Sequence, residues 1–131
     1  MNVRRYTSAD HAMLANWWVA HKWPIIPEVA LPKVGLVIEN KGIPVCAGFL
    51  YQTDSVMAWL EFIVSNPACD TMERGQALDL LIEDLSAYAK ELGFMSLFTS
   101  SNHTRLMERY KEHNFQLSDS GVSHFVRNLC Q

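Results

Sequence analysis

The sequence predicts a single α/β domain over residues 1–131, and three observations lead to this prediction. The chain has 131 residues, 49% of them apolar, which suits one domain with a packed core. An apolar run at 59–64 has the length of a strand, and a stretch with leucines at helical spacing follows it. The chain contains neither repeats nor low-complexity tracts. We expect a mixed sheet, mostly antiparallel and flanked by helices, in the order β-α-β-β-β-α-β-α-β-β.

The first half of the chain predicts a strand, a helix and a β-meander. Residues 3–6 form the strand, and Thr7 and Asp10 have the spacing of a capping box at a helix start. Pro24 ends that helix, because proline disfavours helical backbone in the residue before it. Further prolines keep 23–33 irregular, as a flap over one face. The meander consists of strands at 36–39, 45–51 and 57–64, with turns at 40–42 and 53–55.

The second half predicts two helices and three strands. The first helix has an apolar stripe and ends before Gly93, which favours the left-handed conformation at a helix C-terminus. The elements after it are a strand at 95–99, a helix at 102–112 and the two arms of a closing hairpin at 115–117 and 122–126.

Composition excludes several classes of function. Eleven basic and fourteen acidic residues give a net charge of −3 without a basic stripe, so we expect no nucleic-acid partner. No apolar run reaches the ~20 residues of a membrane span. The three cysteines lack Cys-x-x-Cys spacing, which favours free thiols in a reducing compartment, and no signal peptide is apparent. The expected location is the cytoplasm. The histidines lack ligand spacing, so we predict no metal.

The segment after the apolar strand allows two interpretations. A glycine-bearing loop before a helix holds anions, because backbone N–H groups and the helix dipole favour negative charge there, and Gly75 permits close approach. Alternatively, Asp70 caps a helix that begins at Thr71, with Glu73 three residues after the cap. Gly75 then lies in the second turn.

This segment also carries the first motif of a family resemblance. The strand end Ile63-Val64 is followed by Pro67, and the run Arg74-Gly75-Gln76-Ala77 comes before the apolar stripe. With the element order, this motif resembles the GNAT superfamily of N-acetyltransferases, whose loop amides hold the pyrophosphate of acetyl-CoA. Met72 stands where the family has Gln or Arg, and the loop is longer than the family's. The resemblance implies acetyl-CoA as co-substrate, bound by Ile63, Val64, Met72, Arg74, Gly75, Gln76 and Ala77.

A second motif ends the last predicted helix, at residues 110–115. It is similar to the family's Tyr-x-x-x-Gly-Phe, with Asn114 at the glycine position, where Asn tolerates left-handed backbone. The resemblance implies that Tyr110 protonates the CoA sulfur; the alternative is a buried ring with its hydroxyl at water. At the place of a family Asn, seven residues before the tyrosine, stands His103, preceded by Asn102. Either contacts the cofactor, or Asn102 caps the helix.

Glu61 is the only charge of the apolar strand. Burial there would raise its pKa, which suits a general base that deprotonates an amine; alternatively its carboxylate reaches a neighbouring group or the open cleft. Four tryptophans line the acceptor pocket or fill the core, namely Trp17, Trp18, Trp23 and Trp59.

We therefore expect an N-acetyltransferase that moves an acetyl group from acetyl-CoA to a primary amine of a small molecule or protein, with a homodimer as a further expectation. One alternative is a GNAT-shaped binding module, motivated by Met72 and the long loop. Another is a toxin-like enzyme that acetylates aminoacyl-tRNA, against which the negative charge counts.

Overall fold

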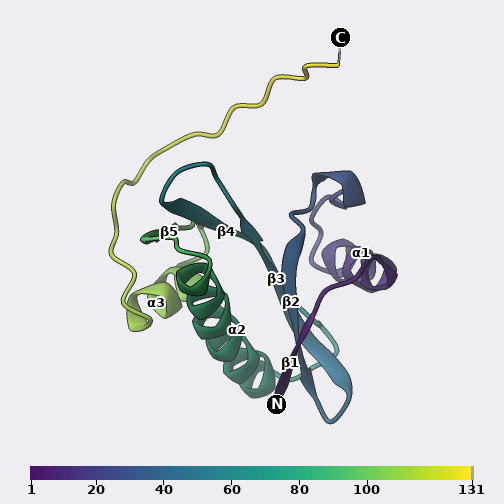
Figure 1. The fold of residues 1–131 in the computed structure, drawn as a ribbon. Coiled ribbons are helices and arrows are strands. Elements are labelled where there is room, and N and C mark those ends of the chain that lie inside the picture. Colours follow the sequence, from purple (N-terminus) through teal and green to yellow (C-terminus); the bar gives the residue numbers. More distant parts are fainter. Residues whose placement is uncertain (131) are drawn as a thin grey trace. The chain divides into compact units, whose positions relative to one another are not determined.

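A computed structural model describes residues 1–130, and the chain divides into two compact units, Met1–Ser101 and Asn102–Gln131. Figure 1 shows the ribbon. The first unit contains the sheet and two of the helices, and the second contains one helix. The organisation as one domain stays a prediction.

The sheet of the first unit has five strands in the order β1-β2-β3-β4-β5. Neighbouring strands are antiparallel except β4 and β5, which are parallel. At the β2–β3 turn, Lys41 and Gly42 have φ of 52° and 80°, the left-handed backbone of a tight hairpin. The predicted mixed sheet is confirmed, with these bounds: β1 (Asn2–Arg5), β2 (Val34–Asn40), β3 (Ile43–Tyr51), β4 (Met57–Ser65) and β5 (Ser96–Phe98).

The helices α1 (His11–Ala20) and α2 (Thr71–Glu91) cover opposite faces of the sheet. Each face therefore has its own apolar core, as expected for a central sheet between two helices. The α1 core contains Leu14, Trp17, Trp18, Val37, Ala47, Phe49 and Val64. The α2 core contains Leu36, Ile38, Leu50, Leu60, Ala77, Leu81 and Leu85, among others.

Helix α1 ends earlier than Pro24 requires. Lys22 has φ of 62°, and its N–H donates to the Val19 carbonyl at 2.9 Å, while the Trp23 N–H donates to the Trp18 carbonyl at 2.8 Å. These two bonds around a left-handed residue form a Schellman motif. The chain therefore turns at Lys22, and the flap leaves the helix in a fixed direction.

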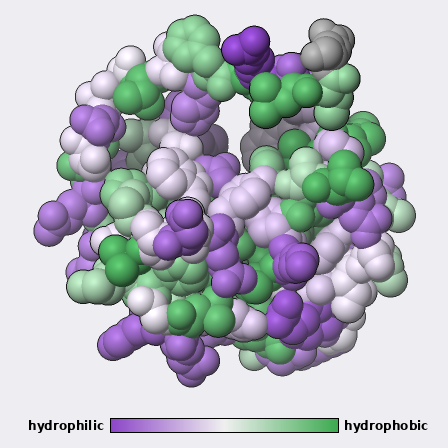
Figure 2. All heavy atoms as spheres, turned by 45° about the horizontal axis from the view of Figure 1, so that its top comes forward, coloured by the Kyte–Doolittle hydropathy of each residue, from purple (hydrophilic) through white to green (hydrophobic). Residues whose placement is uncertain are grey.

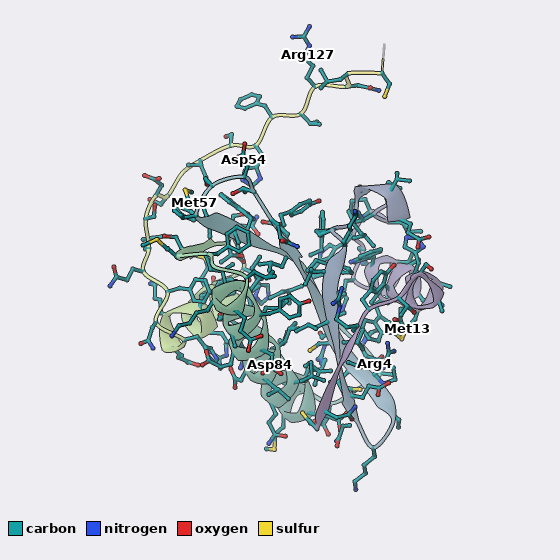
Figure 3. The ribbon with its side chains drawn as sticks, in the orientation of Figure 1. Arg4, Met13, Asp54, Met57, Asp84 and Arg127 are labelled. Atoms are coloured by element: carbon teal, nitrogen blue, oxygen red, sulfur yellow. The ribbon has the colours of Figure 1, made fainter. Side chains whose placement is uncertain are left out.

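The start of α1 is tied to the sheet edge by an ion-pair network. The Arg4 guanidinium donates to Asp10 at 2.8 and 2.9 Å and to Glu39 at 2.9 Å. Figure 3 labels Arg4 beside these elements. Its hydrogen bonds hold the pKa of both carboxyls below their usual range. The predicted capping box contributes as well, because the Thr7 N–H donates to Asp10 at 2.9 Å.

Close packing holds α2 against β3 at Gly48. A Cβ there would lie 3.0 Å from Leu81 and 3.2 Å from both Ile63 and Leu85. A larger residue would push the helix away from the sheet. Gly48 therefore fixes the distance between α2 and the end of β4.

The second unit contains α3 (Thr104–Glu112). The prediction that Asn114 is left-handed is confirmed by its φ of 67°, and the Phe115 N–H donates to the Tyr110 carbonyl at 3.0 Å. The helix cap is His103, whose Nδ1 accepts from the Leu106 N–H at 3.3 Å. The prediction that Asn102 caps this helix is wrong.

The predicted closing hairpin is also wrong. Residues 115–117 and 122–126 form no strand in the part of the chain that the structure describes. Both arms are short, and the residues between them are polar. A two-stranded hairpin is marginal in water without further packing, so alternating hydrophobicity alone overstated this element.

Over residues 1–130, no helix combines the length and apolar character needed to cross a bilayer. Figure 2 shows hydrophilic and hydrophobic residues interspersed over the face that it draws.

Candidate active site

Strand β4 contains a β-bulge at Phe62. Glu61 lies opposite Phe49, and Val64 lies opposite Ala47, so β4 advances three residues while β3 advances two. Phe62 absorbs the extra residue with φ of 56°. Left-handed backbone costs about 1–3 kcal/mol for such a residue and concentrates at functional sites. The bulge is therefore a first marker of a site.

The bulge puts two consecutive side chains on one face of the sheet. Glu61 pairs with Phe49, which belongs to the α1 core, and residues directly opposite in an antiparallel pair share a face. Phe62 packs against the same core. The Glu61 carboxylate therefore lies on the α1 side of the sheet, next to the Phe62 ring.

Strand β4 also has an open edge beyond its middle. Strand β5 pairs with it only from Met57 to Trp59. Thr99 then donates its hydroxyl to the Leu60 carbonyl at 2.9 Å, while β4 continues to Ser65. Within residues 1–101, no strand pairs with that later part of β4 on the β5 side. Such an edge presents backbone N–H and C=O groups that an extended ligand can use.

Two donors orient the Glu61 carboxylate. The Trp59 indole N–H donates to Oε1 at 2.7 Å, and the Ser100 hydroxyl donates to the same oxygen at 3.3 Å. The Trp59 ring stacks on Phe98 with centroids 5.4 Å apart. The side chain is thus held on the α1 side by its own strand and by the segment after β5, which agrees with the interpretation that the carboxylate reaches a neighbouring group.

The flap encloses an apolar hollow on the α1 side. It has a volume of about 190 Å³ and is lined by Trp18, Trp23, Pro24, Ile26, Phe62 and Ile63. Two of the four tryptophans singled out in the sequence are therefore on this wall. Trp17 instead fills the α1 core, and Trp59 holds Glu61.

Two histidines brace the flap. His21 Nε2 lies 2.8 Å from the Ser65 carbonyl, and His11 Nε2 lies 2.8 Å from the Ile26 carbonyl. A carbonyl only accepts, so each Nε2 donates. The His21 ring also stacks on Trp23 at 4.8 Å. The hollow is therefore built from fixed walls.

The start of α2 is closed by carboxylates. Asp70 caps the helix, with Oδ1 accepting from the Glu73 N–H at 2.7 Å, and the Arg74 N–H donates to the Asp70 carbonyl at 3.0 Å. The capped-helix interpretation is confirmed, and the open loop at Gly75 is wrong. Glu73 also accepts from Asn40 at 3.0 Å. Two negative side chains occupy the position where a backbone anion site would need positive potential.

The Arg74 side chain remains the best candidate for a phosphate ligand. Its Nε is buried without a hydrogen-bond partner among residues 1–130, an unsatisfied donor that an anion would reach after a movement of the side chain. The other residues that the sequence predicted to bind acetyl-CoA at this helix start are either exposed or part of the core. Met72 is 75% exposed, Gln76 is exposed, and Ala77 is buried in the α2 core.

The carboxylates at the start of α2 also affect the pKa of the Cys69 thiol. Burial, with hydrogen bonding to Glu73, raises the pKa of its thiol to about 11. Burial also raises the pKa of Cys46. All three cysteines are free.

The remaining predicted site residues belong to the second unit. The Tyr110 ring packs against Phe115 with centroids 5.2 Å apart. Roles for Tyr110, Asn102 and His103 stay predictions. Among residues 1–130, no group of three His, Cys, Asp or Glu side chains is arranged to hold a metal ion.

The sequence analysis missed Phe62, Ser100 and the bracing histidines. Phe62 lies in a run of β-formers, and nothing in that run indicates left-handed backbone. Ser100 approaches Glu61 only through the β4–β5 pairing. The sequence indicated the flap only through its prolines, which lie on both sides of Ile26, and it did not indicate that histidines hold it.

Comparison with known proteins gives the fold. No protein-family model matches the chain, and no curated protein matches it in sequence. Among solved structures, it is similar to Rv2747 from Mycobacterium tuberculosis in complex with CoA and NLQ, with 16% identity and a TM-score of 0.72 over 94% of this chain and 76% of that one. It is also similar to a ribosomal-protein-alanine N-acetyltransferase from Brucella melitensis (15%, TM-score 0.67, 97% and 98% of the chains). A putative acetyltransferase from Agrobacterium tumefaciens gives 14% identity and a TM-score of 0.67 over 98% and 100%. The chain therefore has the fold of GNAT acetyltransferases.

Proposed function

We propose that the chain is an N-acetyltransferase that moves an acetyl group from acetyl-CoA to a primary amine. The observation that supports this most is the bulge in β4 with the open edge beyond it. It leaves free backbone groups for an extended arm, beside a carboxylate held in place by Trp59 and Ser100. One structural neighbour is named for its action on an alanine of ribosomal proteins, and another was solved with CoA.

The residues present suit the co-substrate at two places. The open β4 edge at Ile63 and Val64 is the place for the pantetheine arm, and the unpartnered Arg74 Nε is the place for a phosphate. Asn102 and His103 are proposed as further contacts of acetyl-CoA. Gly75 and Ala77 lie inside α2, so the side chain of Arg74 takes the role that the family gives to loop amides. When bound, acetyl-CoA supplies an activated acetyl group.

The protein's share of the chemistry is to orient the reactants and to move two protons. Glu61 takes a proton from the acceptor ammonium, and the free amine nitrogen then bonds to the acetyl carbon while the carbon–sulfur bond breaks. The nitrogen releases its second proton to solvent as the amide forms. Tyr110 donates its hydroxyl proton to the departing sulfur and is re-protonated from solvent. The products are an amide and a thiol. The homodimer and the cytoplasmic location also remain proposals.

Detection of free thiol tests this function. The protein is incubated with acetyl-CoA and a panel of primary amines, and thiol release is followed together with the mass of the acetylated amine. We expect amine-dependent release, lost in Glu61→Gln. Amine-independent release, or none across the panel, would reject the acetyltransferase proposal.

One observation favours a second candidate, a GNAT-shaped module that binds CoA weakly without turnover. Asp70 and Glu73 put two carboxylates at the start of α2, which opposes a phosphate there. Two measurements separate the candidates. The module would bind CoA weakly in calorimetry, and it would release no thiol with any amine of the panel.

A further inference from the structure

The hollow under the flap indicates which amine the chain accepts. We infer that the acceptor is a primary amine with one aromatic or comparably flat apolar group, seated between Trp23 and Phe62 with its ammonium at Glu61. This inference rests on the proposed function and deepens it by naming the class of acceptor.

The walls of the hollow select against polar acceptors. Its six lining residues are all apolar or aromatic, and none of them carries a charge. A second ammonium or hydroxyl placed there would lose part of its water without a hydrogen-bond partner among the lining side chains, which disfavours binding. Polyamines, amino sugars and lysine side chains with polar surroundings therefore fit poorly.

The size of the hollow limits the group to one ring system. A dry apolar cavity of about 150 Å³ admits benzene, and this hollow has about 190 Å³. A phenyl group fits with room for a short linker. Trp23 is 47% exposed although it is large and apolar, so the hollow opens to solvent along its ring, and a bound ring would cover that surface.

The bulge places the charge partner beside this hollow. Phe62 lines the hollow, and Glu61 precedes it on the same face of the sheet. In a regular strand, consecutive side chains alternate between faces, so only the bulge allows the ring and the carboxylate to face one ligand. An amine whose apolar group occupies the hollow would therefore have the Glu61 carboxylate on the same face of the sheet as its binding site.

The flap is held in the conformation that this recognition needs. His21 binds the end of β4 through the Ser65 carbonyl and stacks on Trp23. His11 binds the Ile26 carbonyl. The wall is thus in place before a ligand arrives, which lowers the entropic cost of binding.

The test compares 2-phenylethylamine with ethanolamine and spermidine as acceptors, in wild type and in Trp23→Ala. We expect 2-phenylethylamine to have the highest kcat/KM in wild type. Trp23→Ala should lower that value by about 10-fold or more, the range for a lost apolar contact, and should lower the ethanolamine value by a smaller factor. Val29→Ala is the matched control, because Val29 belongs to the same flap, is 97% exposed and does not line the hollow.

Each result decides a separate point. A preference for ethanolamine or spermidine overturns the inference and leaves the proposed function standing. If no amine is acetylated, the proposed function fails, and binding of 2-phenylethylamine decides about the hollow. A saturable change in tryptophan fluorescence that is reduced in Trp23→Ala and retained in Val29→Ala supports an aromatic amine site. No saturable change in wild type overturns it.

Discussion

The end of β4 and the start of α2 are neighbours in the sequence but differ in what they offer a ligand. At β4, a bulge leaves the backbone open, and one carboxylate is held in place by two donors. At α2, the Asp70 cap and the Glu73 carboxylate occupy the helix start, and the buried Arg74 Nε has no hydrogen-bond partner among residues 1–130. The difference shows that two segments only a few residues apart can differ in how much backbone they leave open, with the strand edge unpaired and the helix start capped.

The largest effect is expected at the open region, in Glu61→Gln. This change keeps the volume but removes the proton acceptor, so kcat should fall by roughly 10²-fold or more near neutral pH. Activity should recover partly at high pH, where the amine is already neutral. Thiol release over a range of pH measures this. A profile parallel to wild type at similar height would make Glu61 a structural residue.

Tyr110→Phe tests the other proton transfer. The ring and its packing on Phe115 are kept, and only the hydroxyl is lost. If chemistry limits turnover, kcat should fall by about 10²-fold, with CoA affinity by calorimetry nearly unchanged. Activity within a fewfold of wild type would assign the ring to packing alone.

Arg74→Met tests the remaining donor at the closed region. It keeps an unbranched apolar stem and removes the guanidinium. A hydrogen bond to a charged group contributes about 1.5–3 kcal/mol, so CoA should bind about 10- to 100-fold more weakly by calorimetry. Lys90→Met, which removes a positive charge from an exposed position in the last turn of the same helix, is the matched control. Equal affinity of the two variants would remove Arg74 from the site.

Asp70→Asn and Asp70→Ala separate charge from capping. Asn keeps the cap and loses the charge, so CoA affinity should rise a few-fold, as expected for about 0.3–1 kcal/mol at a helix N-terminus. The free energy of unfolding should change little. Asp70→Ala should also lose about 1 kcal/mol of stability. If neither variant binds CoA more tightly than wild type, the carboxylate does not oppose the phosphate.

The smallest effect is expected for the reactivity of Cys69. Its pKa of about 11 leaves little thiolate at neutral pH, so alkylation should be slow and should speed up as pH rises. The negative charge of Asp70 contributes to the raised pKa, so Asp70→Asn should speed alkylation slightly at pH 8. Site-resolved mass spectrometry measures the rate. Fast labelling of wild type at pH 7 would contradict a half-buried thiol among carboxylates.

The sequence predicted the five strands and three helices because their patterns are local. Strands are predicted by alternating apolar and polar residues, and helices by the spacing of their leucines. The helix ends are predicted by a glycine or an asparagine. The Asp70 cap was one of two interpretations of a single segment, and tertiary placement was needed to choose. The hairpin at 115–126 failed because its apolar positions fit a strand without indicating a partner.

The site was predictable only in part. Glu61 stood out as the one charge in an apolar strand. The bulge that puts Phe62 on the same face of the sheet as Glu61 depends on the register of β3 against β4, which no local pattern specifies. The hollow combines residues of α1, the flap and β4, and such a long-range combination lies beyond periodicity and motif.

The most direct test of the central claim is an NMR titration of the isotope-labelled protein with acetyl-CoA. The account predicts saturable shifts of the backbone amides between Phe62 and Ser65 and of the Arg74 Nε–H resonance, with smaller shifts at the amides within α2 beyond Ala77. Saturation that leaves both the β4 edge and Arg74 unshifted, or no binding at millimolar ligand, would contradict it.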